Sequence, residues 1–84
     1  MKFKAKIENL EIRGKEIKDG KSGEYAIIRL DDESGERLEF IDRNPERFDF
    51  YKRRAICDIW VTVTSCKDFT NFTICDMKIK DTED

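Results

Sequence analysis

The sequence predicts an all-β fold of five antiparallel strands, with one short helix between the third and fourth strands. Apolar and polar residues alternate in five short segments, and turn-forming residues separate these segments. The period changes once, at Asn44-Pro45-Glu46, a composition typical of a helix start. A chain of 84 residues is short enough to form one domain, which we place at residues 1–84.

The first predicted strand covers residues 2–13 and contains an irregularity. Its apolar residues occupy odd positions up to Ile7 and even positions from Leu10 onwards. A shift of one residue after Asn9 is typical of a β-bulge, which lets one long strand curl and serve a closed barrel. Residues 14–23 hold three of the four glycines and few apolar side chains, so they are predicted as a flexible, basic connecting loop.

The second and third predicted strands, residues 24–31 and 36–41, form a hairpin around the turn-forming residues 32–35. The side chains predicted to point into the core are Ala26, Ile28, Leu30, Leu38 and Phe40. Those predicted to point outward are Tyr25, Ile27, Arg29, Arg37, Glu39 and Ile41.

A short helix is predicted over residues 45–52. Asn44 is a favoured N-cap, and Pro45 suits the first helical position because its fixed φ fits a helix. Phe48 and Tyr51 lie three residues apart and form the predicted buried side of the helix. A basic run follows at the C-terminal end, where cations complement the helix dipole.

The fourth and fifth predicted strands cover residues 55–65 and 72–79, and the hairpin loop 67–71 joins them. The predicted inward residues are Cys57, Ile59, Val61, Val63, Cys75, Met77 and Ile79. The predicted outward residues are Ile56, Asp58, Trp60 and Thr62. The acidic end of the chain, residues 81–84, is expected to fray.

Two architectures accommodate these elements. A bulged first strand, a meander, a helix after the third strand and a final hairpin match a small five-stranded OB-like Greek-key barrel. An open five-stranded sheet with the helix on one face uses the same elements. We favour the barrel because closure leaves no unprotected sheet edge.

Three stretches resemble small OB-fold single-stranded-DNA-binding proteins of phages and mobile genetic elements. These stretches are the opening strand 1–7, the hairpin Tyr25–Ile41 and the closing strand Phe72–Ile79. The resemblance implies a non-catalytic module that binds single-stranded DNA, with RNA as the alternative ligand. It also implies an accessory role in replication or conjugation.

The residue types on one predicted surface suit that function. Aromatic rings stack on bases, while Arg and Lys neutralise phosphates. The predicted site is the outward face of strands two, three and four, because in an OB-fold single strands lie on this general face, between the first and last hairpin loops. The candidate nucleic-acid-binding residues are Tyr25, Arg29, Arg37 and Trp60 on strands, with Lys15, Lys18, Lys21, Lys67 and Phe69 in loops. The alternative is structural, because aromatic residues of a small β domain often only cover its core.

Composition argues against an enzyme. The chain has no histidine, so it contains no Ser-His or Cys-His nucleophilic pair, and no catalytic residue is assigned. Three cysteines without CxxC spacing predict neither a disulfide framework nor a zinc site, so no metal or cofactor is expected. The start of the chain lacks the apolar core of a signal peptide, and no apolar run spans a membrane, so we expect a cytoplasmic protein.

A rival interpretation is a protein-interaction or assembly module on the same fold. The formal net charge is −2, and residues 31–50 carry eight acids against three arginines. Nucleic-acid binders more often show a basic excess. Outward Ile27, Ile41, Ile56 and Trp60 would then form the contact with a protein partner or with another copy of the chain.

Overall fold

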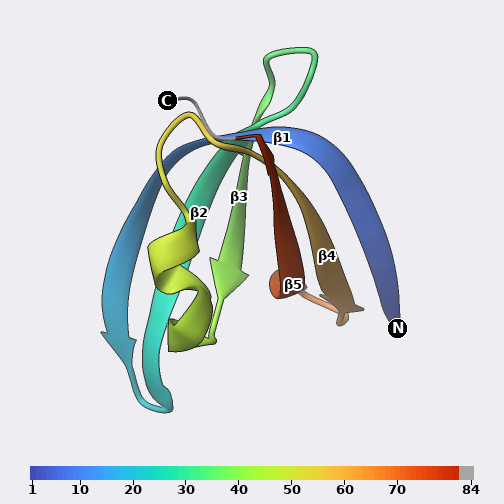
Figure 1. Ribbon diagram of the computed structural model, residues 1–84. Coiled ribbons are helices and arrows are strands. Elements are labelled where there is room, and N and C mark those ends of the chain that lie inside the picture. Colours follow the sequence, from blue (N-terminus) through green and yellow to red (C-terminus); the bar gives the residue numbers. More distant parts are fainter. Residues whose placement is uncertain (82–84) are drawn as a thin grey trace.

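A computed structural model describes residues 1–81 (Figure 1). The elements follow the predicted order of three strands, one short helix and two strands. They are β1 (Lys2–Gly20), β2 (Gly23–Asp31), β3 (Arg37–Asp42), the 3-10 helix η1 (Pro45–Phe50), β4 (Ile56–Ser65) and β5 (Thr70–Asp81). The small all-β fold with one short helix is therefore confirmed.

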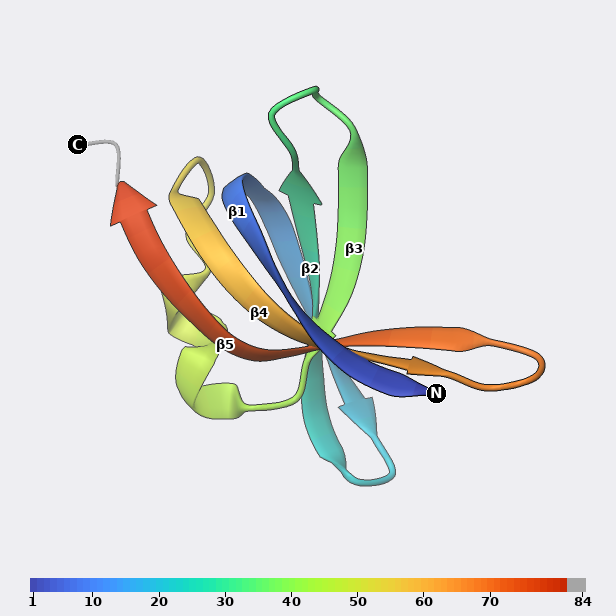
Figure 2. The same cartoon turned by 90° about the vertical axis from the view of Figure 1, so that its right-hand side faces the viewer.

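The five strands close into a ring in the order β1-β2-β3-β5-β4, so the alternative of an open sheet is wrong (Figures 1 and 2). The long strand β1 makes closure possible, because its first half pairs with β4 and its second half with β2. Only β3 and β5 run parallel, and they pair through Ile41 with Thr73 and Asp42 with Ile74. All other neighbours are antiparallel.

The bulge predicted in β1 is confirmed. The register with β4 shifts between Ile7 and Leu10, and Asn9 adopts a φ of 57°. Asn tolerates this left-handed conformation better than most residues. The shift turns Leu10 and Ile12 into the core, where both are fully buried. A bend at this point lets β1 pass from one neighbour to the other.

The loop predicted over residues 14–23 is wrong. Residues 14–20 continue β1 and pair with β2 down to Gly20 and Gly23, so the connection is the two-residue turn Lys21-Ser22. We refer to this projecting two-stranded hairpin, residues 14–29, as the arm. Almost all residues of its tip are exposed, so its sequence lacks the apolar alternation that marks a half-buried strand.

The helix begins as predicted but is a 3-10 helix, and it ends at Phe50 rather than at residue 52. Asn44 caps it, since its side chain accepts a hydrogen bond from the backbone N–H of Glu46 at 3.1 Å. Phe48 and Tyr51 are buried, whereas Phe50 is exposed.

Most of the predicted inward side chains lie in the core or pack against it, and two predictions of side-chain direction are wrong. Cys75 was predicted to be inward but is exposed, because β5 carries a bulge opposite Trp60 and Val61 that turns Ile74 inward instead. Asp58 was predicted to be outward but is buried, because lysines and the β1 bulge cover it. The hydrophobic residues with no or almost no exposed surface are Leu10, Ile12, Ala26, Ile28, Leu30, Cys57, Ile59, Val61 and Ile74.

Two further findings concern the acidic C-terminal residues and the possibility of a membrane-spanning helix. Of the acidic end 81–84 that was predicted to fray, residue 81 closes β5, and residues 82–84 lie outside the described part. Within residues 1–81, no helix has the length and apolar character needed to cross a membrane.

Candidate nucleic-acid interface

The ring divides the predicted binding residues between two faces. Strand β4 is flanked by β1 and β5, whereas β3 is flanked by β2 and β5. Trp60 on β4 is therefore not on the same face as Tyr25, Arg29 and Arg37, and the prediction of one shared surface on strands two, three and four is wrong. Strand neighbours in a ring depend on long-range pairing, which alternation along the chain does not encode.

The β2–β3 face, which consists of the outward side chains of β2 and β3, is electrically compensated. The Arg29 guanidinium lies 3.2 Å from Glu16 and 3.1 Å from Glu39. Arg37 Nε donates to Asp31 Oδ1 at 2.8 Å, and this hydrogen bond and charge raise the pKa of the Arg37 guanidinium. Both arginines therefore have carboxylate partners that a phosphate would have to displace.

The same face carries one aromatic ring. Arg43 lies over Tyr25, with its guanidinium carbon 5.5 Å from the ring centroid. The ring also lies against Gly20, where an added Cβ would be 3.1 Å from Tyr25. Ile27 and Ile41 are half-buried partners across the two strands. Arg43 was missed because the third strand was predicted to end at Ile41, although β3 continues to Asp42.

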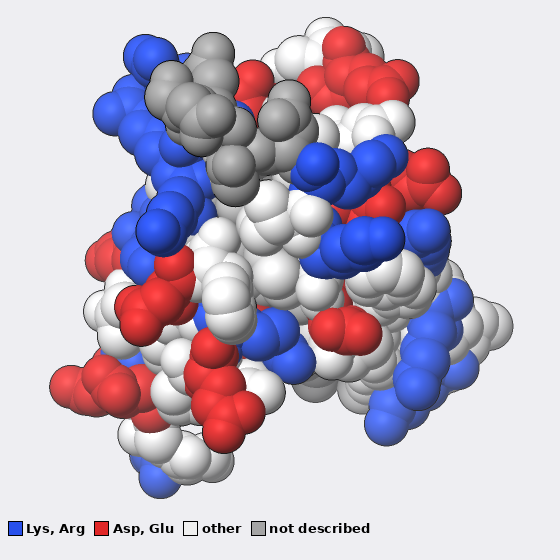
Figure 3. Space-filling model, in the orientation of Figure 1, with Lys and Arg blue, Asp and Glu red and all other residues white. Residues whose placement is uncertain are grey.

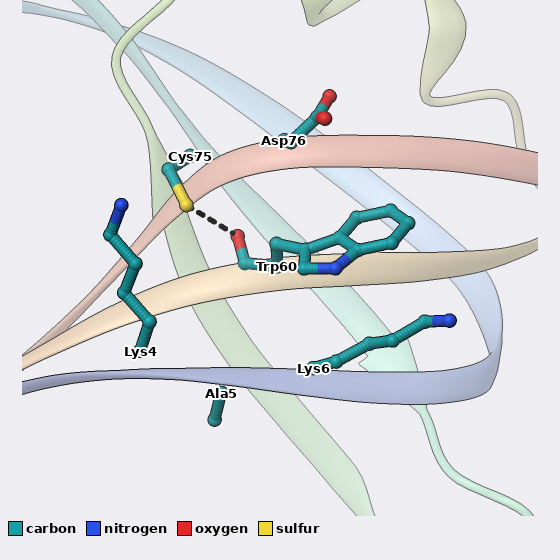
Figure 4. Close-up of a pocket in the computed structure, with 6 residues that line it drawn as sticks. All are labelled: Lys4, Ala5, Lys6, Trp60, Cys75 and Asp76. Carbon is teal, nitrogen blue, oxygen red and sulfur yellow. Dashed lines mark hydrogen bonds between the residues drawn. The ribbon is translucent and has the colours of Figure 1, made fainter.

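The second surface is centred on Trp60. A shallow hollow of about 440 Å³ is bordered by strands β1, β4 and β5 (Figure 4). The Lys6 ammonium lies 5.0 Å from the centroid of the Trp60 ring, a cation–π distance. The Cys75 thiol donates to the backbone carbonyl of Trp60 at 3.3 Å. The hollow is lined by Lys4, Ala5, Lys6, Trp60, Cys75 and Asp76.

A row of lysines borders this hollow. Lys2, Lys4 and Lys6 are exposed on the outward side of β1, and each faces an outward residue of β4. The partners in order are Thr64, Thr62 and Trp60. We call the outward side of β1, β4 and β5 around Trp60 the Trp60 face. In Figure 3, basic side chains gather over the N-terminal part of β1 and over the strands beside it.

The buried carboxylate beneath this face is neutralised. Asp58 accepts a hydrogen bond from the backbone N–H of Asn9 at 3.1 Å. Lys6 and Lys80 lie 3.9 Å and 3.8 Å from its oxygens. The two ammonium groups offset the negative charge of Asp58. Lys2 and Lys4 have no carboxylate within 4 Å among the side chains described for residues 1–80.

The predicted loop residues lie apart from one another. Lys15 and Lys18 are strand residues of the arm. Lys15 donates to the carbonyl of Phe48 at 2.6 Å, and Lys18 lies 3.7 Å from Glu16. Lys21 is in the turn at the tip of the arm. Exposed Lys67 and Phe69 lie in the turn between β4 and β5.

The sequence analysis did not place the lysines of β1 beside Trp60. The available signal was the alternation of Lys2, Lys4 and Lys6, but their placement beside Trp60 needed the pairing of β1 with β4. No family model, curated protein sequence or solved structure matches this chain.

Proposed function

We propose that this chain is a non-catalytic module of the OB-barrel type that binds single-stranded nucleic acid on its Trp60 face. The ring order, the bulged β1 shared by β2 and β4, and the helix between β3 and β4 support the OB assignment. Single-stranded DNA is the preferred ligand, and RNA is the alternative. The proposed setting is cytoplasmic, as an accessory factor in replication or conjugation of a phage or mobile element.

The observation that carries this proposal is the position of the single tryptophan beside Lys6 and beside Lys4, and Lys4 has no carboxylate partner among the side chains described for residues 1–80. A base stacks on an aromatic ring whatever its identity, because every base has a π-face. A phosphate on either side of that base would lie near Lys4 and Lys6, which border the same hollow. This combination gives binding with weak sequence preference and strong salt dependence.

Binding of a base changes the position of the Lys6 side chain. Its ammonium occupies the position over the Trp60 ring that a base would take. Lysine side chains are flexible, so Lys6 moves from the ring to a phosphate when a base stacks. The cost is the cation–π contact, about 0.5–1 kcal/mol at an exposed site.

The test is a titration with a short oligothymidylate, followed by the fluorescence of Trp60 at low and high salt. Since Trp60 is the only tryptophan, the signal reports one place. We expect saturable quenching that weakens with salt, and a matching rise in anisotropy of a labelled oligonucleotide. If both signals stay flat at low salt and high protein concentration, the chain does not bind single-stranded nucleic acid.

A pair of matched variants distinguishes the two faces. Lys4→Gln removes a charge from the Trp60 face, and Arg37→Gln removes one from the β2–β3 face. We expect Lys4→Gln to weaken binding and Arg37→Gln to leave it unchanged, because Asp31 already neutralises Arg37. The reverse pattern would place the ligand on the β2–β3 face and contradict our assignment.

The compensated β2–β3 face favours a second candidate function, a contact with another protein. Its arginines are paired with carboxylates, while Ile27, Ile41 and Tyr25 are half-buried between them. Such a surface suits a protein partner better than a phosphate chain. The Ile27→Lys variant would abolish that contact and leave oligothymidylate binding intact. Pull-down with wild-type and variant protein measures the first effect, and the titration above measures the second.

A further inference from the structure

The arm has one strand edge without a partner. Strand β1 pairs with β4 only as far as Glu11, and Ile12 exchanges backbone hydrogen bonds with Arg54 and Ala55. Beyond that point β1 pairs only with β2. Within residues 1–81, its other edge therefore presents free backbone groups along residues 14–20, at the outer border of the fold (Figure 1).

The turn at the tip of the arm determines which backbone groups face this edge. In a two-residue hairpin the residues that close the turn exchange both backbone hydrogen bonds, here Gly20 and Gly23. Backbone direction alternates along an antiparallel strand, so even-numbered residues of this segment bond to β2. The N–H and C=O groups of Lys15, Ile17 and Asp19 consequently point to the free edge.

The side chains of this edge are complementary to themselves under a two-fold axis. If a second copy of the edge runs antiparallel with Ile17 opposite Ile17, then Lys15 lies opposite Asp19 and Glu16 lies opposite Lys18. The axis doubles each pair, so every charged residue between Gly14 and Gly20 meets an opposite charge. Ile17, 42% exposed, meets its own copy at the centre.

The pairing with Ile17 opposite Ile17 also agrees with the directions in which the backbone N–H and C=O groups point. The three residues whose backbone groups face outward, Lys15, Ile17 and Asp19, lie opposite residues of the same set. Opposing positions of that kind exchange two hydrogen bonds each, so the antiparallel pair closes without a bulge. A slip of one residue would lose both the hydrogen bonds and the charge pairing.

We propose that this edge is a homodimer interface, in which the β1 strands of two copies pair antiparallel about Ile17 and join two arms into one four-stranded sheet. Charged residues on an edge strand commonly serve to prevent pairing. That role needs no particular order of signs, whereas this segment has the order that a second copy complements. The two-fold contact closes after two copies, so it yields a dimer and not a fibre.

The interface lies on the arm, apart from the Trp60 face on β1, β4 and β5. A dimer would therefore leave both hollows open, and its existence does not depend on nucleic-acid binding. The contact is short and polar, which places it among weak interfaces whose population depends on protein concentration.

Sedimentation equilibrium of the wild-type chain, from micromolar to millimolar concentration, tests the proposal. We expect a monomer–dimer equilibrium without larger species. Asp19→Lys places like charges opposite each other twice and should raise the dimer dissociation constant by about tenfold. Lys15→Glu combined with Asp19→Lys restores opposite charges at both positions and should restore the dimer.

The Ile17→Pro variant tests the backbone part of the interface. The Ile17 N–H points to the free edge, where proline is tolerated, so the monomer keeps its fold while the central pair of hydrogen bonds is lost. Thermal unfolding of each variant serves as the control for folding. It is needed above all for Lys15→Glu, because Lys15 also donates to the carbonyl of Phe48. A monomer at all concentrations, or a dimer that is unaffected by Ile17→Pro and Asp19→Lys, would overturn the proposal.

Discussion

At the scale of single residues, the most consequential side chain is one that the sequence did not single out. Asp42 ends β3, is fully buried and accepts hydrogen bonds from Arg47 Nε at 2.8 Å and from the backbone N–H of Asn44 at 2.9 Å. Tyr51 also donates to it, and burial together with Asp42 raises the pKa of the Tyr51 hydroxyl. Arg47 reaches on to the carbonyl of Ile74 at 3.2 Å. This network ties β3, η1 and β5 together at the point where the ring closes.

We expect Asp42→Ala to lower the free energy of unfolding by about 3 kcal/mol, because it leaves the Arg47 charge partly buried without a partner. Urea denaturation measures the change. Asp49→Ala, which removes an exposed carboxylate from the same helix, is the matched control and should change stability by less than about 0.5 kcal/mol. Equal effects of the two variants would show that the network does not stabilise the fold.

The three thiols should differ in reactivity. Burial raises the pKa of Cys57 to about 12, so this thiol stays protonated and inaccessible near neutral pH. Cys66 and Cys75 are exposed. With a thiol-alkylating reagent at pH 8, we expect modification of Cys66 and Cys75 but not Cys57, as measured by peptide mass spectrometry.

Oligothymidylate should protect Cys75, which borders the Trp60 hollow, more than Cys66. Equal protection of both would argue against a ligand in that hollow.

At the scale of elements, the turn before β4 contains a strained residue. Arg54 adopts a φ of 75°, a conformation that costs L-residues about 1–2 kcal/mol. Backbone hydrogen bonds with β1 hold it there, since the Arg54 N–H donates to the Ile12 carbonyl at 2.7 Å. Arg54 and the neighbouring Lys52 and Arg53 are exposed, so the turn presents three basic side chains to solvent.

We expect Arg54→Gly to raise the free energy of unfolding by about 0.5 kcal/mol, since glycine removes the strain but gains entropy in the unfolded chain. Arg53→Gly is the matched control. It removes the same charge at a position without positive φ, so it should destabilise the fold instead. Thermal unfolding of the two variants checks the difference. A lower stability of Arg54→Gly than of Arg53→Gly would contradict this account.

At the scale of the whole molecule, charge distribution matters more than net charge. The formal net charge is −2, yet the carboxylates of the β2–β3 face are largely paired with its own arginines. The exposed lysines Lys2 and Lys4 lack such partners among the described side chains. An anionic ligand responds to this local surface, because salt screens charges more than about 8 Å away at physiological ionic strength.

This distribution makes the salt dependence of binding a direct measurement. Each phosphate contact contributes about 0.7 to the slope of log K against log salt for a single strand. We expect Lys4→Gln to reduce that slope by about 0.7 and Arg37→Gln to leave it unchanged. The measurement is anisotropy of a labelled oligothymidylate at several salt concentrations. A slope that neither variant changes would mean that both side chains lie outside the contact.

Much of the fold could be predicted because alternation is a local property. The inward residues of β2 and of β4, the β1 bulge and the Asn44 cap each depend on neighbours within a few positions. Residues 14–20 of the arm were predicted as a loop because this exposed part of β1 buries too little to show alternation. Cys75 was misplaced because the bulge in β5 shifts the phase of the strand without a mark in the composition.

The candidate site was predictable by residue type but not by arrangement. Trp60 and the row of lysines near the start of the chain were visible in the sequence, yet their contact depends on the long-range pairing of β1 with β4, Lys6 with Trp60. The sequence by itself determined the order of the strands and the helix, most of the inward positions and the absence of histidine. Tertiary structure alone decided which strands are neighbours, which arginines have carboxylate partners and which lysines border Trp60. Those properties are set by long-range backbone pairing, whose register depends on the whole ring and on no local stretch of chain.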